Sequence, residues 1–479
     1  MNYESIYKKM KKSIILLFGL LTVFGCKKEA APPLTDIILT LDQSGEGTFD
    51  IQSGVFPLGQ EISITATAAS GFYFDRWEGS LSSENNPLVF TPDVDTYLKA
   101  IFEPIPELSE NVVLYTPKKM DENHVFMIEN GGRAAYIVDK TGAKIKQWSF
   151  DLNLGNDLEL LPDGGVMGLF KPETLPPFNF GGYGGVLRRY DSNYNLTWEY
   201  ALHDENELLH HDFSILPNGN VMVLVWERIA AAEAVANGVE RTSDLFTEKI
   251  IEIDPTNNTI VWQWRSWEHG VQDVNPDALN YGVLHENFNR INLNYDQRAN
   301  GDIMHANALA YDAERDLIYM SVNFYSEVWV IDHSISTQQA QTSAGDLKYR
   351  FGNPTAYNGT GTRLFYNNHH PNFINPAYGA VGDMMIYNNG TPQEKSVVYE
   401  LDLPDTFVEN GVLVPPTVVW SFEDPELYFN LISGAVRLPN GNTLICEGDW
   451  GYWEVTPAKE VVWQYKGRSW FWRGYTVAN

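Results

Sequence analysis

The sequence predicts an all-β fold, a six-bladed β-propeller preceded by a small β-domain, from three observations. Aromatic residues make up 13% of the 479 residues, and glycine and proline are frequent, which suits short strands joined by turns. A two-strand unit that ends near a tryptophan recurs six times, and a second unit built around a tight polar turn recurs between its copies. Units of fixed type at uneven spacing are typical of propellers and solenoids.

The first recurring unit is a pair of strands joined by a polar turn, with a tryptophan or another aromatic residue near its end. Each copy is expected to form the outer hairpin of one blade. Because the spacing is uneven, insertions are expected in loops near 228–248 and 266–300, the first with a short helix at 230–235. The copies are residues 136–148, 188–200, 250–264, 328–351, 399–422 and 452–465.

The second unit is clearest at 210–226, where a histidine pair precedes a strand, an Asn-Gly turn and another strand. Asn-Gly is a strong hairpin signal because both residues tolerate positive φ. Equivalent positions on successive inner strands of a propeller point toward one central channel, so we expect three histidines to converge there. Aligning the copies on their turns puts these residues at one position of the repeat: Asn156, His211, His305, His370 and Ser433.

Three convergent histidines suit two chemistries. Neutral imidazole is the commonest metal ligand, and histidine also acts as a nucleophile or acid–base group on anionic substrates. Asp212 should point away from His211 across the strand, whereas Asn307 should share the face of His305 and could orient that ring. Four histidines lack the repeat position and are not expected to take part: His124, His203, His269 and His333.

The first 33 residues are not expected to belong to a fold. Four lysines between positions 8 and 12 precede an apolar run at 13–24, which is too short to span a membrane. Residues 1–25 are therefore predicted to be a signal peptide and 26–33 a tether. The run ends in Val-Phe-Gly-Cys, which resembles the lipobox of bacterial lipoproteins; this resemblance implies a lipid on Cys26 and an extracytoplasmic, membrane-anchored protein in the periplasm or on the cell surface. An ordinary signal peptide or an uncleaved anchor is the alternative.

Residues 34–103 are predicted to form a separate small β-domain, because they alternate like strands between Gly- and Ser-rich turns. The segments 71–79 and 96–104 resemble the small bacterial β-repeat domains related to the internalin B-repeat. Trp77 is expected in the core of this domain. The resemblance implies a spacer or an adhesive module rather than a catalytic one.

Prolines 104 and 106 stiffen the connection, so 104–110 is predicted to be a linker and 111–479 the propeller.

The formal net charge of −29 argues against nucleic acid or an anionic membrane surface as a partner, which leaves the lipid anchor as the only expected membrane contact. The only other cysteine, Cys446, lies in an apolar strand pattern, so the processed chain is expected to lack an intrachain disulfide.

Four motifs in order, 210–220, 304–312, 369–390 and 433–455, resemble the bacterial aryl-sulfate sulfotransferases, and 112–148 fits their first blade. The resemblance implies a six-bladed propeller that moves a sulfo group between phenols with no nucleotide donor, metal or organic cofactor. It also implies that one histidine of the channel is transiently sulfated, while two other histidines and an arginine hold the sulfo group.

Carried over by motif, the resemblance places the nucleophile at His370, because its distance to the following turn equals that of His211. His369 is the alternative nucleophile. His211 and His305 match the two supporting histidines.

The arginine of the family is missing, because its Ser-x-Arg reads Ser-Val-Asn here and ends at Asn323. Asn323 can donate a hydrogen bond but carries no charge, and charge-assisted bonds are roughly twice as strong as neutral ones. Either Arg363, Arg350 or Arg298 replaces the missing cation, or activity on ordinary aryl sulfates is reduced or lost. Three aromatic residues are candidates for stacking on a phenol: Phe324, Tyr325 and Trp450.

The predicted function is transfer of a sulfo group from an aryl sulfate to a phenolic acceptor, through a sulfo-histidine in a ping-pong cycle. Small phenols and aryl sulfates are the expected partners. The alternative is a non-catalytic surface lipoprotein that binds a glycan or aryl ligand, which the missing arginine and the adhesive-like module favour. A quinone-dependent propeller dehydrogenase would need a tryptophan-docking repeat that the sequence lacks. The N-terminal β-sandwich of the family is not evident, so no oligomeric state is predicted.

Overall fold

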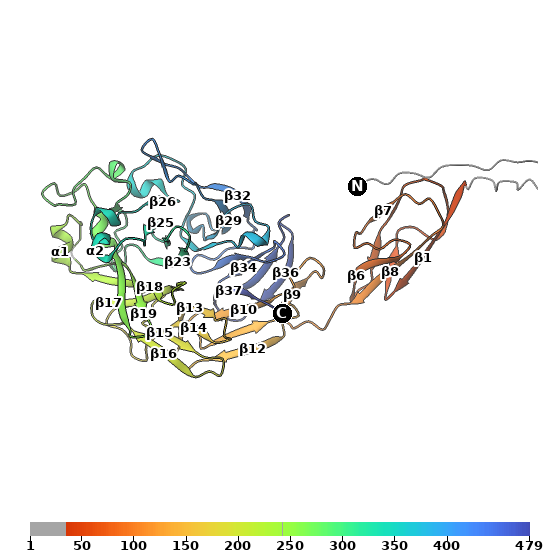
Figure 1. The fold of residues 1–479 in the computed structure, drawn as a ribbon, viewed down its shortest axis with the longest axis horizontal. Coiled ribbons are helices and arrows are strands. Elements are labelled where there is room, and N and C mark those ends of the chain that lie inside the picture. Colours follow the sequence, from red (N-terminus) through yellow and green to blue (C-terminus); the bar gives the residue numbers. More distant parts are fainter. Residues whose placement is uncertain (1–34, 242) are drawn as a thin grey trace, which may run out of the picture. The chain divides into compact units, whose positions relative to one another are not determined.

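The computed structural model describes residues 35–479 apart from residue 242, and the chain divides into two compact units, Met1–Ile105 and Pro106–Asn479. The predicted signal peptide and Cys26 lie outside the described residues. Strands make up nearly all of the regular structure, which confirms the all-β prediction (Figure 1). Within the described residues, no helix has the length and apolar character needed to cross a membrane.

The first unit is a small β-domain built around one tryptophan. The indole of Trp77 is fully buried, lies against Phe49 and Phe74, and donates from Nε1 to the carbonyl of Asn85 at 3.1 Å. Its main sheet has the order β3-β1-β8-β6, and two short pairs, β2-β5 and β4-β7, complete it. The strands are β1 (Asp36–Ser44), β2 (Gly47–Phe49), β3 (Gly54–Pro57), β4 (Ile62–Ile64), β5 (Ala66–Ala68), β6 (Phe72–Gly79), β7 (Leu88–Phe90) and β8 (Thr96–Pro104).

The described part of the second unit contains six antiparallel sheets of four or five strands, in chain order, like the blades of a propeller (Figure 1). The inner strands are β13 (Leu154–Leu160), β17 (Glu207–Ile215), β23 (Ala306–Asp312), β27 (Asn368–Phe373), β33 (Gly434–Arg437) and β37 (Phe471–Val477). The second strands are β14 (Val166–Phe170), β18 (Val221–Ile229), β24 (Leu317–Val322), β28 (Met384–Asn388), β34 (Thr443–Glu447) and β10 (His124–Glu129).

The six recurring hairpins of the sequence are the two outer strands of the six sheets, as expected. They are β11 (Ala134–Val138) with β12 (Lys144–Ser149), β15 (Val186–Tyr190) with β16 (Leu196–Ala201), β19 (Leu245–Asp254) with β20 (Thr259–Arg265), β25 (Glu327–Asp332) with β26 (Tyr349–Phe351), β29 (Val397–Asp402) with β32 (Thr417–Phe422), and β35 (Gly451–Val455) with β36 (Val461–Lys466). The expected insertions carry the short elements α1 (Ala231–Ala236), β21 (Gly270–Val271) and β22 (Ile291–Asn292), and later loops carry α2 (Thr337–Ala340), β30 (Val408–Glu409) and β31 (Val412–Leu413).

The tryptophan of four of these hairpins connects its sheet to the next one. In four of the six sheets, an indole on the fourth strand from the centre donates Nε1–H to the sheet that follows, at distances of 2.7–3.0 Å. A buried indole needs a partner for its N–H group, and a turn of the neighbouring sheet supplies it. The pairs are Trp198 with Asn258 Oδ1, Trp262 with the carbonyl of Ile335, Trp420 with that of Pro457, and Trp463 with that of Lys140.

Both ends of the second unit take part in closing the ring. Each inner strand contacts the inner strand of the next sheet, and β37 contacts both β33 and β13. The C-terminal strand β37 pairs with β10, so it supplies the inner strand of the first sheet. At the other end, β9 (Val112–Tyr115) pairs with β36 on the outside of the last sheet. This corrects the expectation that all of 112–148 belongs to the first blade, and it covers edges that would otherwise be open.

Candidate active site

The repeat position found in the sequence corresponds to a shared irregularity of the inner strands. His211, His305 and His370 all have left-handed backbones, with φ of 53°, 54° and 53°. Each lies at or beside a register shift between an inner strand and its neighbour, and Asn156 lies within the same irregularity of β13. Positive φ is uncommon for residues other than glycine and costs of order 1 kcal/mol or more. Such strain is typical of positions that aim a side chain at a functional site.

A cavity of about 660 Å³ lies beside two of these histidines, His211 and His305. His211, His305 and His369 line it, and the rings of His211 and His305 meet edge to face with centroids 4.7 Å apart. His370 is buried but is not among the residues that line this cavity; its ring lies 6.0 Å from that of Tyr475. Polar and aromatic residues complete the wall, among them Asn156, Asn323, Asn367, Arg298, Phe180, Phe324 and Trp470.

The protonation of His369 is set by Asn389, which the sequence analysis did not single out. The side-chain Nδ2 of Asn389 donates to three backbone carbonyls, those of Phe429, Leu431 and Ile432, at 2.8–3.0 Å. Its Oδ1 must therefore be the acceptor in the 2.6 Å contact with Nδ1 of His369. The Nδ1 atom carries the hydrogen, and Nε2 carries the lone pair. Burial lowers the pKa of His369 to about 3, so the ring is neutral at neutral pH.

His305 has the side chain of an aspartate, Asp302, as its partner. Its Nδ1 makes a short hydrogen bond to Oδ2 of Asp302, a carboxylate that is 1% exposed. One face of the imidazole stacks on Phe324 with centroids 4.6 Å apart, and the guanidinium of Arg298 lies 3.4 Å from the centre of the Phe324 ring. Asn307 was expected to orient His305, but its amide donates to the carbonyl of Asn368 at 2.9 Å. Asp302 fills that role.

Behind His211 lies a row of buried polar side chains, His210 and then Glu248. Its Nδ1 lies 2.8 Å from Nδ1 of His210, whose ring stacks face to face on Trp226 at 3.9 Å. The carboxylate of Glu248 lies 3.0 Å from Nε2 of His210 and accepts a hydrogen bond from the backbone N–H of Ala306. Burial lowers the pKa of both histidines and raises that of Glu248, so all three groups favour their neutral forms.

The buried cation Arg473 was missed by the sequence analysis because it comes from the C-terminal strand β37. Its guanidinium contacts both oxygens of Asp212 at 3.0 and 3.1 Å and lies 3.5 Å from Asp157. Asp212 therefore points toward Arg473 and away from the ring of His211, and it also accepts from the backbone N–H of Leu309. Burial raises the pKa of Asp157 to about 7, against the attraction of Arg473.

Of the three arginines proposed to replace the missing cation, Arg298 alone lines the cavity. Arg350 is fully buried and paired with Glu327. Arg363 donates to the carbonyl of Phe365 and to Oγ of Ser326 at 2.8 Å. Both of these arginines are engaged in holding the fold.

Of the other proposed binding residues, two line the cavity and two do not. Asn323 lines the cavity, where its Nδ2 lies 3.5 Å from Nδ1 of His369. Phe324 lines it as well. Tyr325 does not, because its hydroxyl is buried and donates to the carbonyl of Asn292 at 2.6 Å. Trp450 packs against the hydrophobic core of the last two sheets, outside the cavity wall.

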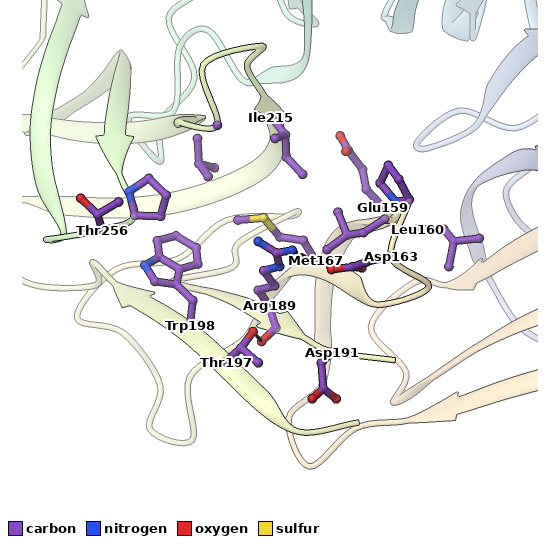
Figure 2. A pocket seen from close by; sticks show the side chains of 15 residues that line it. Glu159, Leu160, Asp163, Met167, Arg189, Asp191, Thr197, Trp198, Ile215 and Thr256 are labelled. Atoms are coloured by element: carbon purple, nitrogen blue, oxygen red, sulfur yellow. Dashed lines mark hydrogen bonds and ion pairs between the residues drawn. The ribbon is translucent and has the colours of Figure 1, made fainter. Parts of the chain in front are cut away.

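A larger cavity of about 890 Å³ lies between the second and third sheets, and no histidine lines it (Figure 2). Its wall combines apolar side chains such as Met167 and Trp198 with an ion pair of 2.8 Å between Arg189 and Asp163. Burial raises the pKa of Glu159 at its edge to about 8. The smaller cavity is therefore the candidate active site, because His211 and His305, which share one position of the repeat, line it.

A cavity lined by three histidines, several asparagine amides and an arginine is suited to hold a small anionic group. The family model of arylsulfotransferases (ASST) matches residues 107–468, and the chain belongs to that family. Membership supports aryl-sulfate sulfotransferase activity. A divergent InlB B-repeat domain matches residues 37–106, in agreement with the resemblance seen in the sequence.

Solved structures similar to the chain share little sequence with it, and no curated protein matches it. One is a protein of unknown function from Bacteroides caccae, with 11% identity, a TM-score of 0.44, and coverage of 74% of this chain and 99% of the other. A putative 6-phosphogluconolactonase from Bacteroides fragilis has 11% identity, a TM-score of 0.41 and coverage of 75% and 99%. The Cps50 (Swd1) β-propeller domain from Myceliophteria thermophila has 8% identity, a TM-score of 0.38 and coverage of 76% and 89%.

Proposed function

We propose that this chain transfers a sulfo group from an aryl sulfate to a phenol, and that Nε2 of His369 carries the group between the two. One observation carries the proposal: His369 is neutral, its hydrogen is held on Nδ1 by Asn389, and the ring borders the cavity. A histidine nucleophile needs an unprotonated ring nitrogen facing its substrate. A pKa of about 3 keeps His369 in that form at every physiological pH.

The chemistry has two displacements at sulfur. In the first, Nε2 of His369 attacks the sulfur, an N–S bond forms, and the bond from sulfur to the aryl oxygen breaks with its electron pair leaving on that oxygen. In the second, the oxygen of the acceptor phenol attacks sulfur, the N–S electron pair returns to Nε2, and the proton of the acceptor passes to solvent, from which the departed aryloxide takes one up. The enzyme is unchanged after both steps, which is a ping-pong cycle.

Arg298 is proposed as the cation that holds the sulfo oxygens in place of the missing family arginine. Its guanidinium reaches the cavity across the Phe324 ring, and it is 46% exposed and, within residues 35–479 without 242, forms an ion pair only with Asp296, at 3.2 Å. A sulfate ester enters with a negative charge, and the chain has a net charge of −29. A local cation is therefore needed to offset the repulsion. Asn323 adds an uncharged amide donor beside His369.

The aryl groups have an apolar wall to rest on. Phe180, Phe324 and Trp470 border the cavity, and Trp470 is 50% exposed at its mouth. Aromatic rings stack on one another with gains of about 0.5–1.5 kcal/mol beyond area burial. This wall suits a phenol better than a polar glycan.

The choice between the two adjacent histidines rests on their surroundings. The repeat alignment favours His370, which shares the backbone geometry of His211 and His305. His369, and not His370, borders the cavity, and the Nδ1 atom of His370 is buried with no hydrogen-bond partner among the described residues. The tautomer of His369 is defined by its partner, which is why we assign the nucleophile to it.

The test is transfer itself, with 4-nitrophenyl sulfate as donor and phenol as acceptor. Release of nitrophenol that depends on the phenol is the expected result. Release at the same rate without phenol would make the protein a sulfatase. No release with any phenol would favour a non-catalytic ligand-binding propeller. A His369→Ala protein that still releases nitrophenol with phenol would remove His369 from the mechanism.

A further inference from the structure

The inner strand β23, which begins directly after His305, has one edge without a neighbouring strand. It stands first in its sheet, with the order β23-β24-β25-β26, so backbone groups on its other edge have no ladder partners. Two backbone groups of β23 are bonded to side chains from other sheets. The carbonyl of Asn307 accepts from Nη2 of Arg473 at 3.1 Å, and the N–H of Leu309 donates to Oδ2 of Asp212 at 2.7 Å. Buried backbone groups need such partners.

Arg473 and Asp212 connect three inner strands. Arg473 lies on β37 and Asp212 on β17, and both contact β23. The guanidinium donates to both oxygens of Asp212, a planar two-bond contact that a lysine cannot reproduce. Arg473 is 3% exposed and Asp212 is 1% exposed, so solvent is largely excluded from the contact. The pair therefore fixes the three strands relative to one another.

Both contacts lie at the irregularities that aim the cavity histidines. Asp212 follows His211 within the register shift of β17. Asn307 lies within the register shift of β23, two residues after His305. A bulge interrupts the ladder and leaves a residue unpaired, so the position of each histidine depends on contacts outside its own sheet. Arg473 supplies one such contact to each bulge.

The same contacts lead to the proposed nucleophile. Nδ2 of Asn307 donates to the carbonyl of Asn368 at 2.9 Å, and Asn368 directly precedes His369. Arg473 is thereby linked to the backbone beside all three histidines that line the cavity. It is not itself among the residues that line the cavity, so any effect on the reaction must pass through its partners.

We propose that Arg473 is a positioning residue for sulfo transfer, which through Asp212 and the backbone of β23 holds His211 and His305 at the separation that the sulfo group requires. The inference rests on the proposed function. The rings of the two histidines meet with centroids 4.7 Å apart, and a misplacement of about 1 Å can cost about 10²-fold in rate. Loss of the contact should lower kcat and leave KM almost unchanged, because Arg298 and the aromatic wall, which bind the donor, lie outside it.

The experiment measures kcat and KM for 4-nitrophenyl sulfate, with phenol as acceptor, in Arg473→Lys, Asp212→Asn and the double variant. Each single variant should lower kcat by about 10- to 100-fold and change KM by less than about twofold. The double variant should lose little more than the larger single loss, because residues that act as one unit give non-additive losses.

Asp157→Asn is the matched control. Asp157 is 2% exposed and lies 3.5 Å from the same guanidinium, but it makes no hydrogen bond to β23 among the described residues. It should keep the wild-type kcat, although its stability changes. All variants are assayed at a temperature at which their circular dichroism shows them folded.

Wild-type kcat in both single variants would overturn the proposal. An equal loss of kcat in Asp157→Asn, additive losses in the double variant, or a rise in KM at constant kcat would overturn it as well, because each indicates a general effect on stability or on binding. If Arg473→Lys does not fold, Asp212→Asn and the control decide alone. Failure of the proposed function is recognised separately, because the wild-type protein would then release no nitrophenol with phenol.

Discussion

Removal of the Arg298 side chain tests whether Arg298 binds the sulfo oxygens in place of the arginine that the family has at position 323. In Arg298→Ala the cavity loses the one arginine that lines it. Hydrogen bonds to charged groups contribute about 1.5–3 kcal/mol each, and each 1.4 kcal/mol is a tenfold change. The value of kcat/KM for 4-nitrophenyl sulfate should therefore fall by roughly 10- to 150-fold. Arg298→Lys should fall less, because it keeps the charge but loses the planar fork.

Arg315→Ala is a matched control for this variant. Arg315 is 45% exposed and Arg298 is 46% exposed, each has one aspartate partner, and Arg315 lies outside the cavity wall. Its kcat/KM should stay at the wild-type value. Asn323→Arg should have little effect alone but should restore much of the activity lost in Arg298→Ala, because it returns a cation to the position of the family arginine. Wild-type kcat/KM in Arg298→Ala, or equal losses in both alanine variants, would refute the reasoning.

Three further predictions concern the rest of the chain. Because burial raises the pKa of Asp157 to about 7, its protonated form stabilises the fold at low pH, and that stabilisation is lost as the pH rises from about 4 to 7. The Tm of Asp157→Asn relative to wild type should therefore rise between pH 5 and pH 8, and a constant difference would contradict the assignment. Cys26→Ser should move the protein from the membrane fraction to the soluble fraction; continued sedimentation with membranes would argue against a lipid anchor. A chain that begins at Pro106 should keep the melting transition of the second unit, since the two units have separate cores, and a large loss of Tm would show a shared one.

Much of the fold could be predicted because it repeats. The six hairpins stand out in the sequence because they share one pattern, and in four of them the tryptophan donates a hydrogen bond to the next sheet. The sequence analysis did not predict the pairing of the two ends of the second unit, because that pairing occurs once and does not repeat. β37 and β9 complete sheets whose other strands lie at the far end of the chain, and no local pattern reveals such pairing.

In the candidate site, too, the repeating features could be predicted from the sequence and the features that occur once could not. The position of His211 and His305 in the repeat was visible, because a bulge in each inner strand sets it. The hydrogen-bond partners of the site residues were not. Asn389 lies 20 residues from His369, and the buried cation Arg473 lies 261 residues from Asp212. Asp302 lies three residues before His305, and this short spacing is the one signal that could have been read from the sequence.

The most direct test of the account is to locate the covalent intermediate. The wild-type protein is incubated with 4-nitrophenyl sulfate alone, digested, and the peptide that contains the histidine pair is sequenced by mass spectrometry. The account predicts one added sulfo group on His369, which disappears when phenol is supplied. A sulfo group on His370 would contradict the assignment and restore the choice made by the repeat alignment. Transfer to phenol with neither histidine modified would contradict the covalent mechanism itself.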